Sequence, residues 1–167
     1  DWLAIVLEHH RQIEAAFTQA MVAPDGASRM AALKRLAVLL TGHANAEESV
    51  LYPAVSEGGE KDHAATAYEE QALAKVELAR LERLDPMGKD WHETLEHLQG
   101  AVLHHMCEEE GTWFPELQQR LSAVDRPRLT RRFVEEFERY THGPAAHEAP
   151  LQMAVHQSGP ASEPMGK

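Results

Sequence analysis

Apolar residues recur at steps of three and four along most of the chain before residue 143, which is the spacing of one face of an α-helix. No strand-like alternation of apolar and polar residues interrupts this pattern. Its breaks divide the sequence into five helices, which we expect over about residues 2–23, 28–55, 61–84, 85–121 and 127–140. The pattern therefore predicts an all-α protein.

Glycine and proline mark the expected ends of these helices. Pro24-Asp25-Gly26 forms a turn after the first helix, and Ser28 is a suitable N-cap for the second. Gly58-Gly59 separates the second helix from the third, while Asp85-Pro86 supplies a cap and an early proline for the fourth. Pro115 is expected to end or kink the fourth helix near its last turns.

The C-terminal segment differs from the rest of the chain in composition. Residues 143–167 have prolines at positions 144, 150, 160 and 164 and little periodicity. We therefore expect one helical domain over residues 1–142, followed by an irregular tail over 143–167 that wraps the bundle or is mobile.

Four of the expected helices carry a narrow apolar stripe, as in an antiparallel up-down four-helix bundle with a short fifth helix added. Each stripe is interrupted by polar residues at a similar depth. The stripes are Leu3, Val6, His10, Ile13 and Phe17; Leu33, Leu36, Leu40, His43, Glu47 and Val50; Ala64, Ala67, Gln71, Ala74, Leu78 and Leu81; and Leu98, Val102, His105, Glu109 and Thr112.

Composition narrows the class of protein. The chain has 167 residues, 43% of them apolar, and no apolar run of the roughly 18 residues that a membrane span needs. Its formal charge of −11 argues against nucleic-acid and anionic-membrane binding. Cys107 is the single cysteine, and no basic-then-apolar signal segment opens the sequence. We therefore expect a cytoplasmic protein without disulfides.

One pattern occurs twice. His43 and Glu47 are four residues apart and are followed by Tyr52-Pro53, and His105 and Glu109 have the same spacing before Phe114-Pro115. On a helix, this spacing places the imidazole and the carboxylate one turn apart on the same face. Two such pairs on two helices can converge on one metal centre.

The polar interruptions require compensation if they are buried. A carboxylate in an apolar seam is strongly unfavourable unless it is paired, and no Lys or Arg lies on these stripes. Histidine nitrogens with carboxylate oxygens suit iron, zinc or manganese. Five or six such ligands exceed one tetrahedral zinc site and fit a pair of metals bridged by Glu47 and Glu109.

In each of the doublets His9-His10 and His104-His105, one histidine is the better candidate ligand. His10 and His105 fit the stripes, whereas His9 and His104 point about a quarter-turn away and are expected to be outer-sphere or exposed.

These segments resemble the hemerythrin family, specifically the bacterial hemerythrin-like HHE cation-binding domains. The similar segments are EHHRQIEAAF, GHANAEESVLYP and HHMCEEEGTWFP, and the likeness covers about residues 1–122. The resemblance implies an up-down four-helix bundle with a non-haem di-iron centre, whose two metals are joined by an oxo or hydroxo bridge. The metal ligands would be His10, His43, Glu47, His105 and Glu109.

The chain departs from the family in its third helix, where the family normally supplies a histidine and this sequence has Gln71. Gln71 could bind weakly, solvent could fill the position, or Tyr68, Glu70 or His63 could substitute. Glu14, one turn after His10, could also reach the site.

The resemblance implies a protein that binds iron and a small ligand, dioxygen, nitric oxide or peroxide, for oxygen or redox sensing or for carriage. Turnover of peroxide or nitric oxide at the same centre is an alternative, as is an iron or zinc storage module without redox function. The histidine-rich ligand set favours binding over enzymatic oxygen activation. A sensor would need a separate protein partner for its output.

Overall fold

The structure is a computed structural model that describes residues 1–143. Within that range the chain is all-helical, as predicted, and the expected bundle is confirmed. The elements are α1 (Trp2–Val22), α2 (Gly26–Ala46), η1 (Glu47–Leu51), α3 (Tyr52–Glu57), α4 (Lys61–Leu81), α5 (Lys89–Glu108), η2 (Glu109–Trp113), α6 (Phe114–Arg120) and α7 (Asp125–Thr141).

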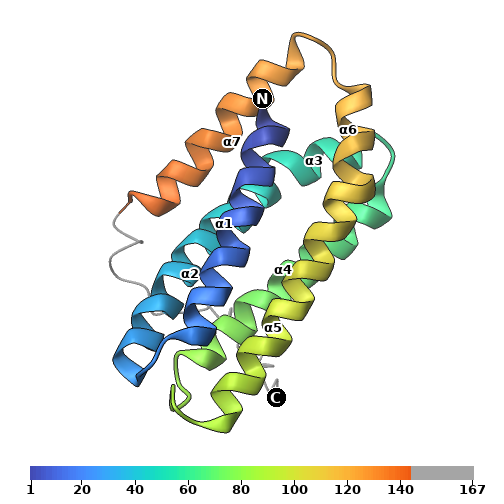
Figure 1. The fold of residues 1–167 in the computed structure, drawn as a ribbon. Helices are drawn as coiled ribbons and strands as arrows, with labels where there is room; N and C mark the ends of the chain where they lie inside the picture. Colours follow the sequence, from blue (N-terminus) through green and yellow to red (C-terminus); the bar gives the residue numbers. More distant parts are fainter. Residues whose placement is uncertain (144–167) are drawn as a thin grey trace, which may run out of the picture.

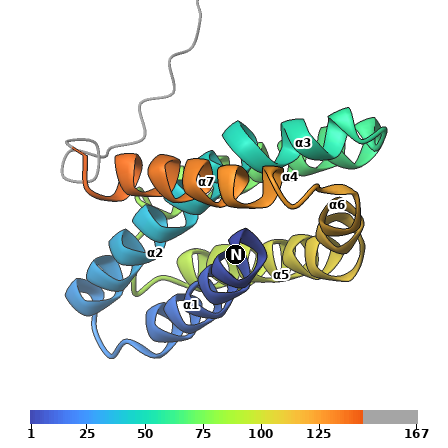
Figure 2. The same cartoon turned by 90° about the horizontal axis from the view of Figure 1, so that it is seen from above.

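The four long helices α1, α2, α4 and α5 run alternately down and up (Figure 1). The fifth helix, α7, returns along the bundle and packs mainly on α2 and η1, and also on α1 (Figure 2). At Gly42 the backbone of α2 approaches α7 so closely that an added Cβ would lie 2.8 Å from Thr141 Cγ2. The expected tail lies almost wholly outside the described residues.

Two π-helical turns interrupt the helices where proline was expected to end or kink one of them. They are η1 and η2, which begin at Glu47 and Glu109. The Tyr52 and Phe114 N–H groups bond to the carbonyls of Glu47 and Glu109, five residues back, and proline follows each aromatic residue. Since proline has no N–H and its ring crowds the preceding turn, the widened turn lets each helix continue past it.

Each π-turn shifts the buried face by about one residue. Thr112, placed on the fourth stripe by the 3.6-residue period, is exposed, and Trp113 is buried in its place. The prediction for Thr112 was therefore wrong, because a π-turn holds more residues than an α-turn.

Three helix boundaries also differ from the prediction. The N-cap of α2 is Asp25, whose side chain accepts a hydrogen bond from the Ser28 N–H at 2.8 Å, so Ser28 is not the cap. The fourth helix starts at Lys89 and not at Asp85, since residues after Asp85 form a turn closed by the Gly88 N–H. The third helix ends at Leu81.

The core has two apolar halves separated by a polar layer. One half contains Phe17, Leu36, Leu78, Trp91 and Leu95, among others. The other contains Trp2, Leu51, Trp113, Phe114 and Phe133 with their neighbours. The predicted polar interruptions lie between the halves, so they are enclosed by apolar side chains above and below. None of the helices in the described part of the chain is long and apolar enough to cross a membrane.

Candidate metal centre

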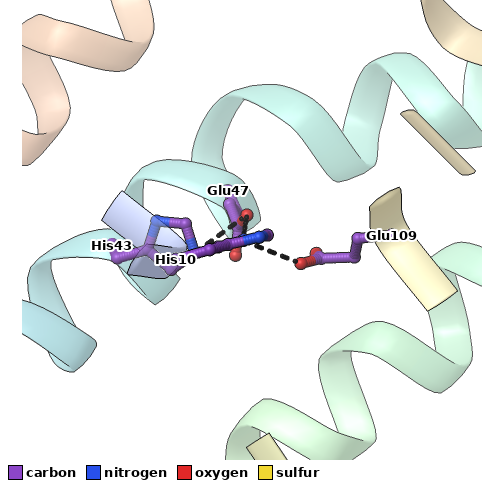
Figure 3. Close-up of side chains that lie close together, drawn as sticks. All are labelled: His10, His43, Glu47 and Glu109. Carbon is purple, nitrogen blue, oxygen red and sulfur yellow. Dashed lines mark ion pairs between the residues drawn. The ribbon is translucent and has the colours of Figure 1, made fainter. Parts of the chain in front are cut away.

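Four predicted ligands, each from a different element, meet between the two halves of the core (Figure 3). His10 comes from α1, His43 from α2, and Glu47 and Glu109 from the first positions of the two π-turns. One side-chain nitrogen or oxygen of each lies within 4.8 Å of those of the others. His43 Nε2 is 3.2 Å from Glu47 Oε1, and His10 Nε2 is 3.4 Å from Glu109 Oε2.

These facing atoms lack hydrogen-bond partners. His10 Nε2, His43 Nε2, Glu47 Oε1 and Glu109 Oε2 are all buried, and none has a partner among the described residues. Leaving such atoms unsatisfied is unfavourable by about 1–3 kcal/mol each, and more for charged groups. Two imidazole nitrogens and two carboxylate oxygens directed at one point form a donor set that suits iron, zinc or manganese. The residues present therefore fit a metal cation.

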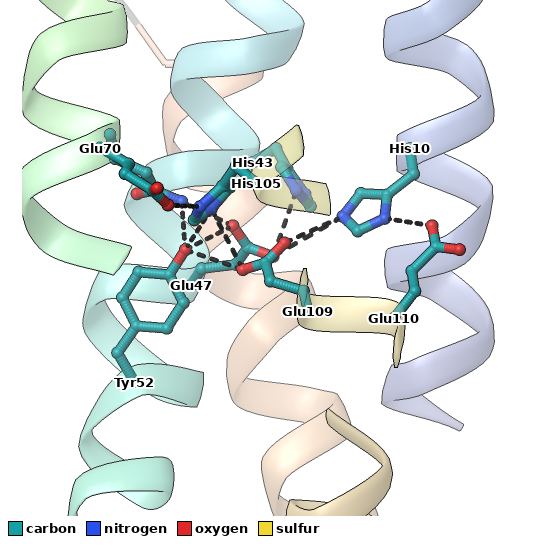
Figure 4. Close-up of polar contacts among 9 residues, drawn as sticks. His10, His43, Glu47, Tyr52, Glu70, His105, Glu109 and Glu110 are labelled. Atoms are coloured by element: carbon teal, nitrogen blue, oxygen red, sulfur yellow. Dashed lines mark hydrogen bonds and ion pairs between the residues drawn. The ribbon is translucent and has the colours of Figure 1, made fainter. Parts of the chain in front are cut away.

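The other oxygens of the two glutamates face a different group. The Tyr52 hydroxyl lies 3.2 Å from Glu47 Oε2, 2.9 Å from Glu109 Oε1 and 3.0 Å from His105 Nε2 (Figure 4). The Gln71 amide donates to Glu47 Oε2 at 2.7 Å and also to the Tyr52 hydroxyl. The centre thus has two sides. On the side of His10 and His43, which we call the open side, the buried donor atoms have no hydrogen-bond partners, and on the side of Tyr52 they are hydrogen-bonded.

Comparison with protein families identifies the family of this fold. Residues 3–117 match the model of the hemerythrin HHE cation-binding domain. The chain belongs to this family. The matched residues include all four side chains of the open side and Tyr52 on the other, so the buried cluster of this hemerythrin-like domain can hold a metal cation.

One curated protein is similar to this chain at low sequence identity. A protein named DNA nickase from Nostoc sp. is 26% identical over 119 residues, which is 71% of this chain. The hemerythrin-like chain spans about a third (34%) of that protein's length, so the match concerns one part of the relative. No solved structure matches the chain.

Two carboxylates hold histidines of the hemerythrin-like site from outside. Glu110 Oε1 lies 2.7 Å from His10 Nδ1, and Glu70 Oε2 lies 2.7 Å from His105 Nδ1. Such contacts fix the ring orientation and keep the proton on Nδ1, which directs Nε2 inward. Glu48, at the position in the first repeat that corresponds to Glu110, instead pairs with Lys75 at 2.6 Å.

Without metal, two of the histidines are strong proton acceptors. For His10, burial acts to lower the pKa, but the nearby carboxylates of Glu109 and Glu47 outweigh it and raise the pKa to about 10. For His105, burial again opposes the carboxylates Glu109, Glu47 and Glu70, which raise the pKa to about 9. In the metal-free protein both imidazoles therefore carry a proton at neutral pH.

The structure distinguishes the residues that were considered in place of a third-helix histidine. Gln71 and Glu70 reach the site, as described above. Tyr68 is 40% exposed and its hydroxyl donates to the Glu48 carbonyl, so it does not face the ligands. His63 lies beside Glu60 and stacks on Trp113. Glu14 is exposed. Tyr68, His63 and Glu14 are therefore not brought to the centre.

The four histidines of the two doublets take different positions in the structure. His10 and His105 face the centre, and His104 is exposed. His9 is buried: its ring centroid is 4.1 Å from that of Phe137 on α7 and 5.6 Å from that of His43. Burial, followed by the neighbouring His43, lowers the pKa of His9 to about 4. The His9 ring is therefore uncharged at neutral pH, and it packs between α1 and α7.

Neither Tyr52 nor Glu110 was predicted from the sequence as a site residue. Tyr52 was noted as part of the repeated aromatic-proline pair, but the 3.6-residue period does not direct it to the site. The available signal was the difference between the copies, since Tyr52 corresponds to Phe114 and carries the extra hydroxyl. That hydroxyl contacts Gln71, the residue at the position of the family's histidine.

Proposed function

We propose that this domain is a non-haem di-iron protein that binds a small ligand such as dioxygen for oxygen or redox sensing or for carriage. The observation that carries the proposal is the set of four buried, unpartnered donor atoms at His10, His43, Glu47 and Glu109. The ligand set is rich in histidine, which favours binding over the oxygen activation associated with carboxylate-rich sets.

One metal would be held by His10 and His43, and the second by His105, with Glu47 and Glu109 bridging them. Each glutamate directs one oxygen to each side, which supports this division. On the second side the Tyr52 oxygen, which contacts both glutamates and His105, would serve as an additional ligand where Gln71 stands in place of histidine. When bound, an iron pair supplies an open coordination position for dioxygen, nitric oxide or peroxide.

The protein would prepare this chemistry through its outer contacts. Glu110 and Glu70 hold the Nδ1 protons of His10 and His105, so that each Nε2 faces inward. Apolar side chains on both sides exclude water and strengthen the electrostatic interactions within the site.

Turnover of peroxide or nitric oxide is a second candidate. Tyr52 favours it, because a buried hydroxyl in contact with both glutamates can donate a proton to a bound ligand. Burial and then the charges of Glu109 and Glu47 raise the pKa of Tyr52 well above its usual range, which keeps the hydroxyl protonated in the metal-free protein.

Metal analysis with absorption spectroscopy tests the proposal. The purified protein, reconstituted anaerobically with ferrous iron, is expected to hold about two irons per chain and to develop near-ultraviolet and visible bands when exposed to air. Zinc, one metal or none, without an oxygen-dependent spectrum, would contradict it. Measuring peroxide and nitric oxide consumption by the same sample separates binding from turnover.

Replacing Tyr52 by Phe tests the role of its hydroxyl. We expect Tyr52→Phe to weaken binding of the second iron and to remove any visible charge-transfer band from phenolate to ferric iron. In the metal-free state the change leaves His105, Gln71 and both glutamates short of a partner, and should destabilise the fold by about 1–3 kcal/mol.

Tyr68→Phe is the matched control, since Tyr68 packs edge-to-face against Tyr52 but donates only to a backbone carbonyl. Equal spectra and equal iron content in the wild type and Tyr52→Phe would show that the phenol is not a ligand.

A further inference from the structure

A cavity of about 310 Å³ lies between α2, α4 and α5, adjoining the Gln71 side of the metal centre. It exists because α2 packs closely on α1 and α7 but only slightly on α4. Small side chains on all three helices keep it open: Ala44, Ala74 and Ala101. The larger apolar residues of its wall are Leu40, Leu73, Leu78, Leu98, Val102 and Met106.

Part of the cavity lining is polar and buried. Gln71, His43, His105 and Thr41 belong to this part. Gln71 Oε1 and Thr41 Oγ1 are buried and have no hydrogen-bond partner among the described residues, while Gln71 as a whole is 6% exposed. The amide nitrogen of Gln71 is occupied by Glu47, so its oxygen is left as an acceptor for another molecule.

Charged and polar side chains complete the lining, including Glu70, Lys75, Glu77 and His97, which are at least partly exposed. The buried part of the wall is otherwise mostly aliphatic. Lys75 of the lining already pairs with Glu48, and Glu70 pairs with His105, so a charged ligand would lose hydration and compete with existing ion pairs. An uncharged ligand with a hydrocarbon body would bury its apolar surface against that wall.

We propose that this cavity binds a small, uncharged aliphatic alcohol, with its chain along α4 and α5 and its hydroxyl donating to Gln71 Oε1. A dry cavity of about 150 Å³ accommodates a benzene-sized molecule, so this volume accommodates about ten non-hydrogen atoms. That is larger than any diatomic ligand, and it lies within the size range of small-molecule sites in proteins.

The cavity and its ligand do not depend on the identity of the metal. Only the consequence that the alcohol is held beside the metal centre rests on the proposed function. The experiment therefore measures binding in the metal-free and the iron-loaded protein, so that loss of iron chemistry and loss of ligand binding are scored separately.

The probe is 1-octanol, titrated calorimetrically into the full chain, with octanoate as the charged comparison. We expect saturable binding of one 1-octanol per chain in both metal states, and at least about tenfold weaker binding of octanoate. Gln71→Leu should weaken 1-octanol binding, because it removes the acceptor and keeps the volume.

Two alanines on α4 supply a matched pair of variants. Ala74→Phe fills the cavity and should weaken 1-octanol binding by about tenfold or more, because the ring displaces the probe from the apolar wall. Ala72→Phe places the same ring at an exposed position and should leave binding unchanged. Absence of saturable binding in the wild type, or equal affinity in Ala74→Phe and Ala72→Phe, overturns the proposal.

Discussion

Replacing Glu47 by Ala is expected to remove most of the bound metal, and replacing Glu109 by Ala should do the same. Each glutamate faces both sides of the centre, so each substitution removes one oxygen from each proposed metal. Even outer-sphere partners contribute about 10–100-fold to metal affinity, so the loss for a bridging ligand should exceed about 100-fold. Metal analysis after reconstitution and desalting measures it.

Glu47→Gln separates charge from shape, since glutamine fills the same volume without the negative charge. It should also lose metal while retaining the helical circular dichroism spectrum. Glu48→Gln is the control from the same π-turn, because Glu48 is directed at Lys75 and away from the centre. Retention of two metals per chain in both alanine variants would contradict the assignment.

The helical bundle and the layer of polar residues were predictable from sequence, because both depend on local periodicity. His10, His43, Glu47, His105 and Glu109 interrupt apolar stripes whose spacing places them at one level of the bundle. The repeat of the same spacing in two segments added independent support. In the structure, the first three and Glu109 share one point, while His105 faces Tyr52 and Glu109 on the other side.

Tyr52 could not be placed in the same way. Its position depends on a π-turn, and that turn reflects the balance between a proline at position 53 and the packing that keeps the helix going. The regular 3.6-residue period carries no information about such a widened turn. The same cause accounts for the wrong prediction at Thr112, which follows Glu109 in the second π-turn.

The outer carboxylates also depend on packing between helices. Glu70 reaches His105 across the contact between α4 and α5, and Glu110 reaches His10 across that between α1 and η2. Neither distance follows from spacing along one helix. Glu48 has the same sequence context as Glu110 and yet pairs with Lys75, so the repeat alone would have predicted the wrong partner.

Metal loading is expected to release protons, and the apparent metal affinity should rise with pH. Metal binds neutral imidazole, whereas the metal-free protein holds protons on His10, with a pKa raised to about 10, and on His105, with a pKa raised to about 9. At pH 7 loading should therefore displace about one to two protons per chain. Calorimetry in buffers of different ionisation enthalpy measures this number, and pH-independent affinity between about pH 6 and 9 would contradict it.

The same protons make the stability of the metal-free protein fall as the pH rises. A folded-state pKa above the unfolded value of about 6.5 stabilises the fold at low pH, and this stabilisation is lost as pH rises through 9 and 10. The melting temperature of the metal-free protein should therefore fall from pH 7 to pH 10. The metal-loaded protein has no such protons to lose, so the difference in melting temperature between the two forms should widen over this range. A constant difference would mean that His10 and His105 are already neutral before metal binds.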